Sequence, residues 1–242
     1  MKNIFLILLF LGNYTAQCQK QINNIRCIEA TSIFPVFTKN GDVSKYDTGK
    51  IKFYFFGSRR LYDLQYEFTH KDNGKIIVSE IRRHFVVFEK DSAYGIDLNL
   101  TTGVKKRVKL DSLLKNEWFV KNKFYPIITS NISILKDSIR KRNLDALVIN
   151  YDIRRKIDTL LIGKCKFSFT NEMKDFDLSL SRELDSIFKM KLFKVEILNL
   201  FQYYKESNYI LKQFKTFYAL KETIVFDRNK ILNYFNMFLE QK

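Results

Sequence analysis

The stretch LYDLQYEFTHKDNGKIIVSEIRRHFVVFEK (residues 61–90) contains the pattern that decides the fold class. Its first part has apolar side chains at every second position: Tyr62, Leu64, Tyr66 and Phe68. A period of two residues predicts a β-strand with one apolar face and one polar face. Asn73-Gly74 follows, and this dipeptide favours the positive φ angles of a tight hairpin turn. We therefore expect an antiparallel hairpin here.

The same pattern continues on the C-terminal side of the hairpin. A turn at residues 90–92 leads to a second alternating set of apolar residues: Tyr94, Ile96, Leu98 and Leu100. Another turn at residues 101–103 leads to a strand that ends near Leu110. Strands joined by short turns predict an antiparallel β-meander over residues 51–110, with one face on a core and the other toward solvent.

Helical patterns appear in the C-terminal half. Apolar residues recur at helical spacing over residues 132–139, and Ser181 can cap a helix. Asp227 precedes an amphipathic pattern that ends at Leu239. Strand patterns lie between these segments, over residues 144–151, 157–169 and 193–197, and residues 209–226 fit either structure. The sequence predicts an α+β fold, with an antiparallel β-meander in the N-terminal half, packed with helices, and a C-terminal amphipathic helix.

The first residues have the layout of a secretory signal peptide. Lys2 precedes an uncharged apolar run over residues 4–11, and small and polar residues follow. The run is well short of the roughly 20 residues that span a bilayer, so we expect no transmembrane segment after the signal is removed. We predict a signal peptide over residues 1–18 and a single α+β domain over residues 19–242. The mature protein is expected to be exported, either to a periplasm or as a secreted protein.

Lipid anchoring through Cys18 is the alternative for this N-terminus. A lipoprotein signal normally has a small residue before the acylated cysteine, and Gln17 is not small. Ala16 and Cys18 instead fit the small residues that signal peptidase prefers before a cut at Gln19. We therefore favour a soluble exported protein over a lipid-anchored one.

The chain is strongly basic, with 42 Lys and Arg residues against 26 Asp and Glu residues and a net charge of +16. Such a balance favours contact with anionic partners. An exported protein meets little nucleic acid, so we expect an anionic envelope polymer or a lipid surface instead. The basic residues gather in three clusters, whose candidate anion-binding members are Lys105, Lys106, Arg107, Lys109, Arg140, Lys141, Arg142, Arg154, Arg155 and Lys156.

Two cysteines remain if the signal peptide is removed. An oxidising compartment would permit a disulfide between Cys27 and Cys165, and so long a loop would gain up to about 4–5 kcal/mol in the chain-entropy model. Cys165 lies between two lysines, which favour a thiolate, but the alternation of its strand favours an inward-facing thiol. We expect no metal, because the cysteines and histidines lack close paired spacing.

No motif in the chain indicates catalysis. Neither the glycine-rich phosphate-binding patterns nor Gly-x-Ser-x-Gly occurs, so no cofactor is expected. His70 and His84 are the near-neutral acid–base groups. The sequence favours a non-catalytic exported protein that binds or scaffolds an anionic partner. Two alternatives stay open: a lipid or hydrophobic-ligand carrier with its aromatic residues around a cavity, and a hydrolase that uses His84 with a nearby acid.

Overall fold

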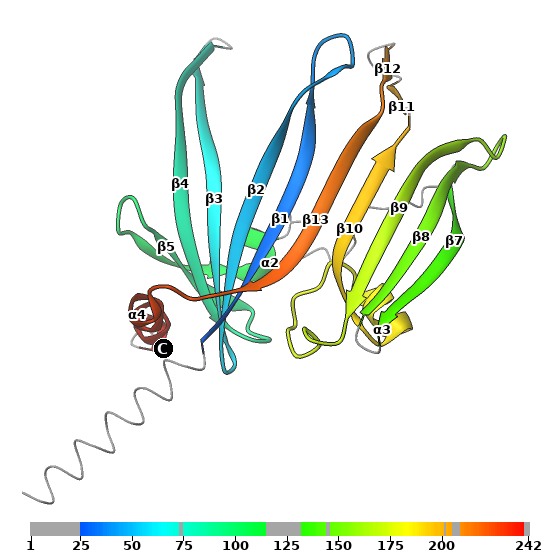
Figure 1. The fold of residues 1–242 in the computed structure, drawn as a ribbon. Helices are drawn as coiled ribbons and strands as arrows, with labels where there is room; N and C mark the ends of the chain where they lie inside the picture. The colour runs from blue at the N-terminus through cyan, green and yellow to red at the C-terminus, as the bar shows by residue number, and fades with distance from the viewer. Residues whose placement is uncertain are drawn as a thin grey trace, which may run out of the picture. The chain divides into compact units, whose positions relative to one another are not determined.

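The computed structural model describes residues 25–72, 75–114, 132–143, 146–200, 202–204 and 209–239. The predicted signal peptide, Cys18 and the predicted turn at Asn73-Gly74 lie outside these residues. Eleven strands form one sheet in the order β6-β5-β4-β3-β2-β1-β13-β10-β9-β8-β7, and β11 pairs with β12 separately (Figure 1). The strands are β1 (Arg26–Phe37), β2 (Val43–Phe56), β3 (Arg59–Asp72), β4 (Lys75–Glu89), β5 (Tyr94–Asn99), β6 (Lys105–Lys109), β7 (Ile132–Asn143), β8 (Ala146–Arg155), β9 (Leu161–Thr170), β10 (Lys191–Asn199), β11 (Gln202–Tyr204), β12 (Tyr209–Leu211) and β13 (Phe214–Thr223).

This architecture corrects the predicted α+β class: the protein is nearly all β. The described residues form three helices, α2 (Leu110–Leu114), α3 (Arg182–Phe188) and α4 (Arg228–Leu239), which are 5, 7 and 12 residues long. The C-terminal helix was expected and is present as α4. The three described helices are too few and too short to cover the sheet as a layer, so the prediction of a meander packed with helices is wrong.

The error arose mainly at residues 132–139, which form β7 rather than a helix. The β7–β8 register shifts between Lys136 and Ser138, which indicates a β-bulge. Because of the shift, Ile132 pairs with Arg155 and Ile139 with Ile149, so two isoleucines seven positions apart, a helical spacing, belong to the same face of the strand. A bulge can therefore give a strand an apolar spacing that imitates a helix.

The expected meander is present in the N-terminal half. β2, β3, β4, β5 and β6 pair in sequence, and each of these pairs is antiparallel. Leu64 lies opposite His84, which in turn lies opposite Asn99, so one row of residues crosses three strands. Side chains in one row point to the same face of a sheet. Residues far apart in the sequence can therefore line one pocket on that face.

The described residues divide into two compact units. Unit 1 takes its described residues from Met1–Glu29, Ile51–Leu113 and Glu222–Lys242. Unit 2 takes its described residues from Ala30–Lys50 and Leu114–Lys221. None of the helices in the described part of the chain is long and apolar enough to cross a membrane.

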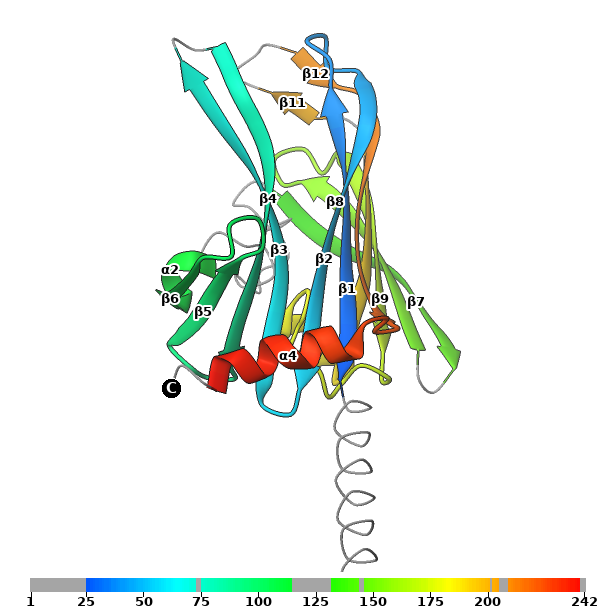
Figure 2. The same cartoon turned by 90° about the vertical axis from the view of Figure 1, so that its left-hand side faces the viewer.

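Unit 1 has a core on one face of its strands, where α4 packs across them (Figure 2). Asp227 caps this helix, because its Oδ1 accepts a hydrogen bond of 3.0 Å from the backbone N–H of Lys230. Ile231 and Phe235 point from α4 into a cluster that contains Leu61 and Phe85. The Asp227 cap and the apolar stripe predicted from the sequence are both confirmed.

Unit 2 buries an apolar row that crosses four strands. Ile149, Phe167, Val195 and Tyr218 are register partners from β8, β9, β10 and β13, and each is at most 7% exposed. Ser181 caps α3 as expected and accepts from the backbone N–H of Leu184. The opposite face of the same four strands lacks this apolar character, and it contains the candidate site.

Candidate anion-binding groove

A groove of about 420 Å³ crosses β8, β9, β10 and β13 in unit 2. Its residues come from three successive rows of the sheet. The middle row contains Tyr151, Cys165, Ile197 and Thr216, whose side chains point to the apolar face. The two flanking rows therefore form the walls of the groove, and the backbone of the middle row forms its floor. The walls are Asn150, Lys166, Glu196 and Phe217 on one side, and Asp152, Lys164, Leu198 and Lys215 on the other.

The sequence Lys164-Cys165-Lys166 shows how strand alternation builds this site. Both lysines line the groove, whereas Cys165 points to the other face and is 3% exposed. Burial raises the pKa of the Cys165 thiol to about 12, and the charge of Asp152 acts in the same direction. The inward-facing thiol expected from the alternation is confirmed, and the lysines do not activate it.

Glu196 organises the first wall. Its carboxylate pairs with Lys166 at 3.5 Å and also with Lys194, whose ammonium group lies 5.3 Å from the ring centre of Phe217. Burial opposes the ionisation of Glu196, but the hydrogen bond and charge of Lys194, together with those of Lys166, outweigh it and lower the pKa of the carboxyl. An ionised Glu196 thus holds two ammonium groups beside the groove.

The second wall carries cations without such a partner. Lys164 and Lys215 are exposed, and no ion pair to either is found within the part of the chain that the structure describes. Asp152 in this wall accepts a hydrogen bond of 2.9 Å from Arg154. Leu198 lies between the two lysine strands and adds an apolar surface.

The groove therefore combines positive charge with apolar surface. Five cationic side chains lie in or beside it, against two carboxylates. Its volume falls within the roughly 300–1,000 Å³ typical of ligand sites. Ammonium groups donate hydrogen bonds and accept none, so the arrangement suits a ligand with anionic groups and an apolar body.

The basic residues predicted from the sequence lie elsewhere. Lys105, Lys106, Arg107 and Lys109 are all exposed on β6, the strand at one end of the sheet order. The Arg107 guanidinium lies 4.9 Å from the ring centre of Tyr94. These four remain candidates for anion contact.

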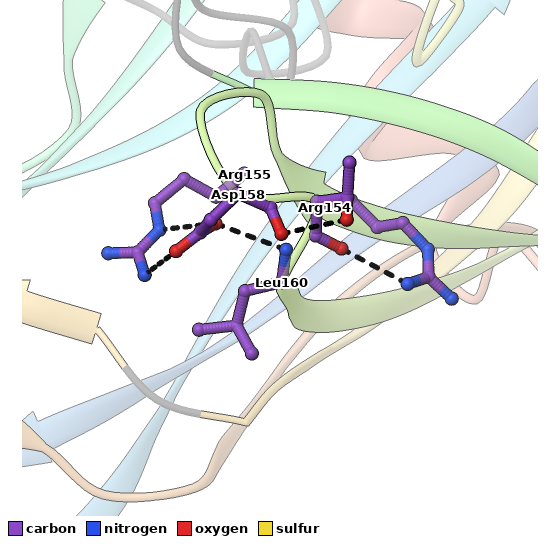
Figure 3. Close-up of polar contacts among 5 residues, drawn as sticks. Arg154, Arg155, Asp158 and Leu160 are labelled. Carbon is purple, nitrogen blue, oxygen red and sulfur yellow. Dashed lines mark hydrogen bonds and ion pairs between the residues drawn. The ribbon is translucent and has the colours of Figure 1, made fainter.

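Arg154 and Arg155 have structural partners at the turn between β8 and β9 (Figure 3). Arg155 pairs with Asp158, whose Oδ1 also accepts from the backbone N–H of Leu160. Arg154 donates to the carbonyl oxygen of Thr159 at 3.1 Å, in addition to its bond with Asp152. Both guanidinium groups therefore stabilise the end of this hairpin.

The remaining candidates occupy two further places. Lys156 is exposed in the β8–β9 turn, and Arg140, Lys141 and Arg142 belong to β7, with side chains outside the described ones. Sequence reasoning missed Lys164, Lys166, Lys194 and Lys215 as a group, because their rows are assembled from three strands. The available signal was the alternation of lysine with apolar residues over residues 164–167.

The cysteines and histidines are the remaining groups that the sequence singled out. Cys27 and Cys165 are free, buried thiols on β1 and β9, which are not neighbours in the sheet order. Their pairing gains no support here and stays a prediction. No cluster of three His, Cys, Asp or Glu side chains that could hold a metal is found among the described residues. His70 lies on β3 with its side chain outside the description, and His84 contacts Asp97.

Comparison with known proteins adds no family. No protein-family model matches the chain. A search of curated proteins also gives no significant match.

Proposed function

We propose that this protein is an exported, non-catalytic binding module that holds an anionic polymer of the cell envelope or the extracellular space in the groove of unit 2. One observation carries the proposal: Lys164 and Lys215 stand exposed on one wall, opposite the Lys166–Glu196–Lys194 group on the other. The signal-like N-terminus supports export, and the net charge of +16 supports an anionic partner.

The groove also explains why the ligand would be held rather than only attracted. Exposed charges alone give weak, salt-screened attraction. Here Leu198 and Phe217 place apolar surface between the charges. A ligand that covers this surface removes it from water, and this burial adds to the electrostatic attraction. A polymer with regularly spaced anionic groups can contact both walls at once.

The aromatic residues argue for this module over a hydrophobic-ligand carrier. Phe53, Phe169 and Phe235 are fully buried, and each packs against another ring, at centroid distances between 4.7 and 5.7 Å. Aromatic side chains that pack on one another contribute to a core. The groove is therefore a better-supported binding site than a cavity lined by these aromatic residues.

The test compares dextran sulfate with neutral dextran as ligands of the mature protein, measured by titration calorimetry at several salt concentrations. We expect binding of dextran sulfate alone, with an affinity that falls as salt rises. The double variant Lys164→Gln/Lys215→Gln should weaken binding by about 5- to 30-fold, if each cation contributes about 0.5–1 kcal/mol.

The matched control removes the same amount of charge elsewhere. Lys174 and Lys230 are exposed on the surface of unit 2 and unit 1 respectively, and neither lines the groove. Lys174→Gln/Lys230→Gln should keep most of the affinity. Equal losses in the two double variants would show that net charge, and not the groove, binds the polymer, and the proposal would then fail.

A further inference from the structure

A second, smaller pocket lies in unit 1 and has a different chemistry. Its volume is about 170 Å³. The lining residues come from β4, β5, β6 and the β5–β6 turn: His84, Asp97, Asn99, Thr102, Val104 and Lys106. Register explains why they meet, because His84 lies opposite Asn99 and Asp97 lies opposite Lys106. Four polar side chains therefore share one face of three neighbouring strands.

Asp97 and His84 form a fixed pair within this pocket. His84 Nδ1 lies 2.9 Å from Asp97 Oδ1, and both side chains are mostly shielded, at 18% and 15% exposed. An ionised carboxylate only accepts hydrogen bonds, so Nδ1 donates. The pair sets the orientation of the Asp97 carboxylate, whose second oxygen remains an acceptor.

The other polar groups are arranged as donors. Asn99 Oδ1 accepts from the backbone N–H groups of Thr101 and Thr102, at 2.9 and 3.1 Å, which leaves its side-chain NH₂ as the donating end. The hydroxyl oxygen of Thr102 accepts from the N–H of Val104 at 3.4 Å, so its proton can be donated. Lys106 is exposed and adds three N–H donors and a positive charge.

We infer that this pocket binds a hydrogen phosphate group, with Lys106, Thr102 and Asn99 donating to the oxygens of the ligand and Asp97 accepting its proton. Donors outnumber acceptors here, as an oxyanion requires. At about 30 Å³ for each water-sized atom, the pocket has room for roughly five non-hydrogen atoms, which is the size of a phosphate ion.

Asp97 gives the site its selectivity. Phosphate carries a proton at neutral pH that a carboxylate can accept, whereas sulfate carries none and would bring an unprotonated oxygen against Asp97. A site that contains an acceptor for a ligand proton rejects the analogue that lacks this proton. We therefore expect phosphate to bind at least about tenfold more tightly than sulfate, at equal ionic strength.

The experiment titrates the mature protein with inorganic phosphate, sulfate and glycerol phosphate, followed by the NMR shifts of backbone amides. Lys106→Gln should weaken phosphate binding about tenfold. Lys109→Gln is the matched control, because Lys109 lies on the same strand but on its opposite face. This variant should leave the affinity of the pocket for phosphate unchanged. Asp97→Asn should abolish the preference for phosphate over sulfate.

The outcomes separate clearly. Glycerol phosphate that binds as tightly as phosphate would identify the group as the end of a larger phosphorylated molecule; weaker binding would identify free phosphate. Wild-type protein that binds sulfate as well as phosphate overturns the inference, as does equal weakening by Lys106→Gln and Lys109→Gln. The lysine pair keeps the test decisive if Asp97→Asn does not fold. The Lys164→Gln/Lys215→Gln variant should bind phosphate normally, so this inference and the proposed function can fail separately.

Discussion

The ammonium group of Lys191 lies 3.0 Å from Oδ2 of Asp185, and the two side chains are only 9% and 16% exposed. Asp185 belongs to α3 and Lys191 begins β10, so the pair joins a helix to the sheet. The same carboxylate accepts from the backbone N–H of Leu192 at 2.6 Å and from the hydroxyl of Ser179 at 2.7 Å. One carboxylate thus satisfies three donors of unit 2.

Removing this carboxylate should destabilise the protein strongly. Asp185→Ala leaves a buried cation and two donors without their partner, and loss of one member of a buried ion pair costs about 3–5 kcal/mol. Urea unfolding of the whole protein would measure the change in the free energy of unfolding. The control is Asp47→Ala, which breaks the exposed pair with Lys45 and should cost less than about 1 kcal/mol. Similar losses in both variants would contradict the role given to Asp185.

Glu196→Gln should strengthen polyanion binding and lower the stability of the fold. Its carboxylate holds Lys166 and Lys194, so its neutralisation frees both cations for a polyanion. We expect dextran sulfate affinity to rise about two- to fivefold at neutral pH, equivalent to about 0.5–1 kcal/mol. Unchanged or weaker binding would show that these lysines do not face the ligand.

The stability effect of Glu196 depends on pH with a definite sign. The folded state lowers the pKa of this carboxyl below its ordinary value of 4.5, so the unfolded state binds the proton more readily. The contribution to stability is therefore present above about pH 4.5 and is lost as the pH falls through the lower, folded-state pKa. Denaturation of wild type and Glu196→Gln across this range should show the difference between them shrinking in acid.

The two cysteines should be inert in the folded protein. Cys27 is 1% exposed and Cys165 is 3% exposed, and burial raises the pKa of both thiols. A thiol-specific dye at mildly alkaline pH should label neither Cys27 nor Cys165 in the native protein, and both in concentrated guanidinium. A denatured, unreduced protein that shows no thiols, with a mass two hydrogens lighter, would instead establish the predicted Cys27–Cys165 disulfide.

Gly163 is required by close packing beneath one end of the groove. A Cβ at this position would lie 2.8 Å from the carbonyl oxygen of Leu198 and 3.2 Å from Cδ1 of Ile153. The backbone of Leu198 cannot move away easily, so Gly163→Ala should lower the free energy of unfolding by about 1–3 kcal/mol. Displacement of Leu198 should also weaken polyanion binding. Gly49→Ala is the control, because its added Cβ meets only the rotatable hydroxyl of Ser32 and should cost less than about 1 kcal/mol. Thermal unfolding of the two variants distinguishes them.

Local patterns predicted individual strands well. The alternation in residues 61–68 and 94–100 corresponds to β3 and β5, and the caps Ser181 and Asp227 begin the helices expected of them. These features depend on a few neighbouring residues. The helical reading of residues 132–139 failed because the bulge after Lys136 depends on pairing with β8, which the spacing of apolar residues does not reveal.

The candidate sites were less accessible to sequence reasoning. The groove brings Asp152, Lys164, Leu198 and Lys215 into one wall, and their order follows from a sheet in which β13 lies beside β10. The basic clusters that stand out in the sequence include Arg154 and Arg155, whose charges are used within their own hairpin. A cluster of basic residues in the sequence shows where positive charge lies along the chain. Whether that charge can bind a ligand depends on which acidic and carbonyl groups lie near it in the fold.

The positions of β6 and β7 at the two ends of the sheet have a further consequence. End strands have backbone groups that can pair with another chain, and lysines on such strands discourage this association. β6 carries Lys105, Lys106, Arg107 and Lys109, and the sequence of β7 includes Lys136, Arg140, Lys141 and Arg142. Two copies that met edge to edge would place like charges a strand spacing apart, so we expect these strands to oppose growth into fibrils. A polyanion that neutralised these strands would remove that protection, and the ratio of protein to polymer would then decide whether the complex stays dispersed.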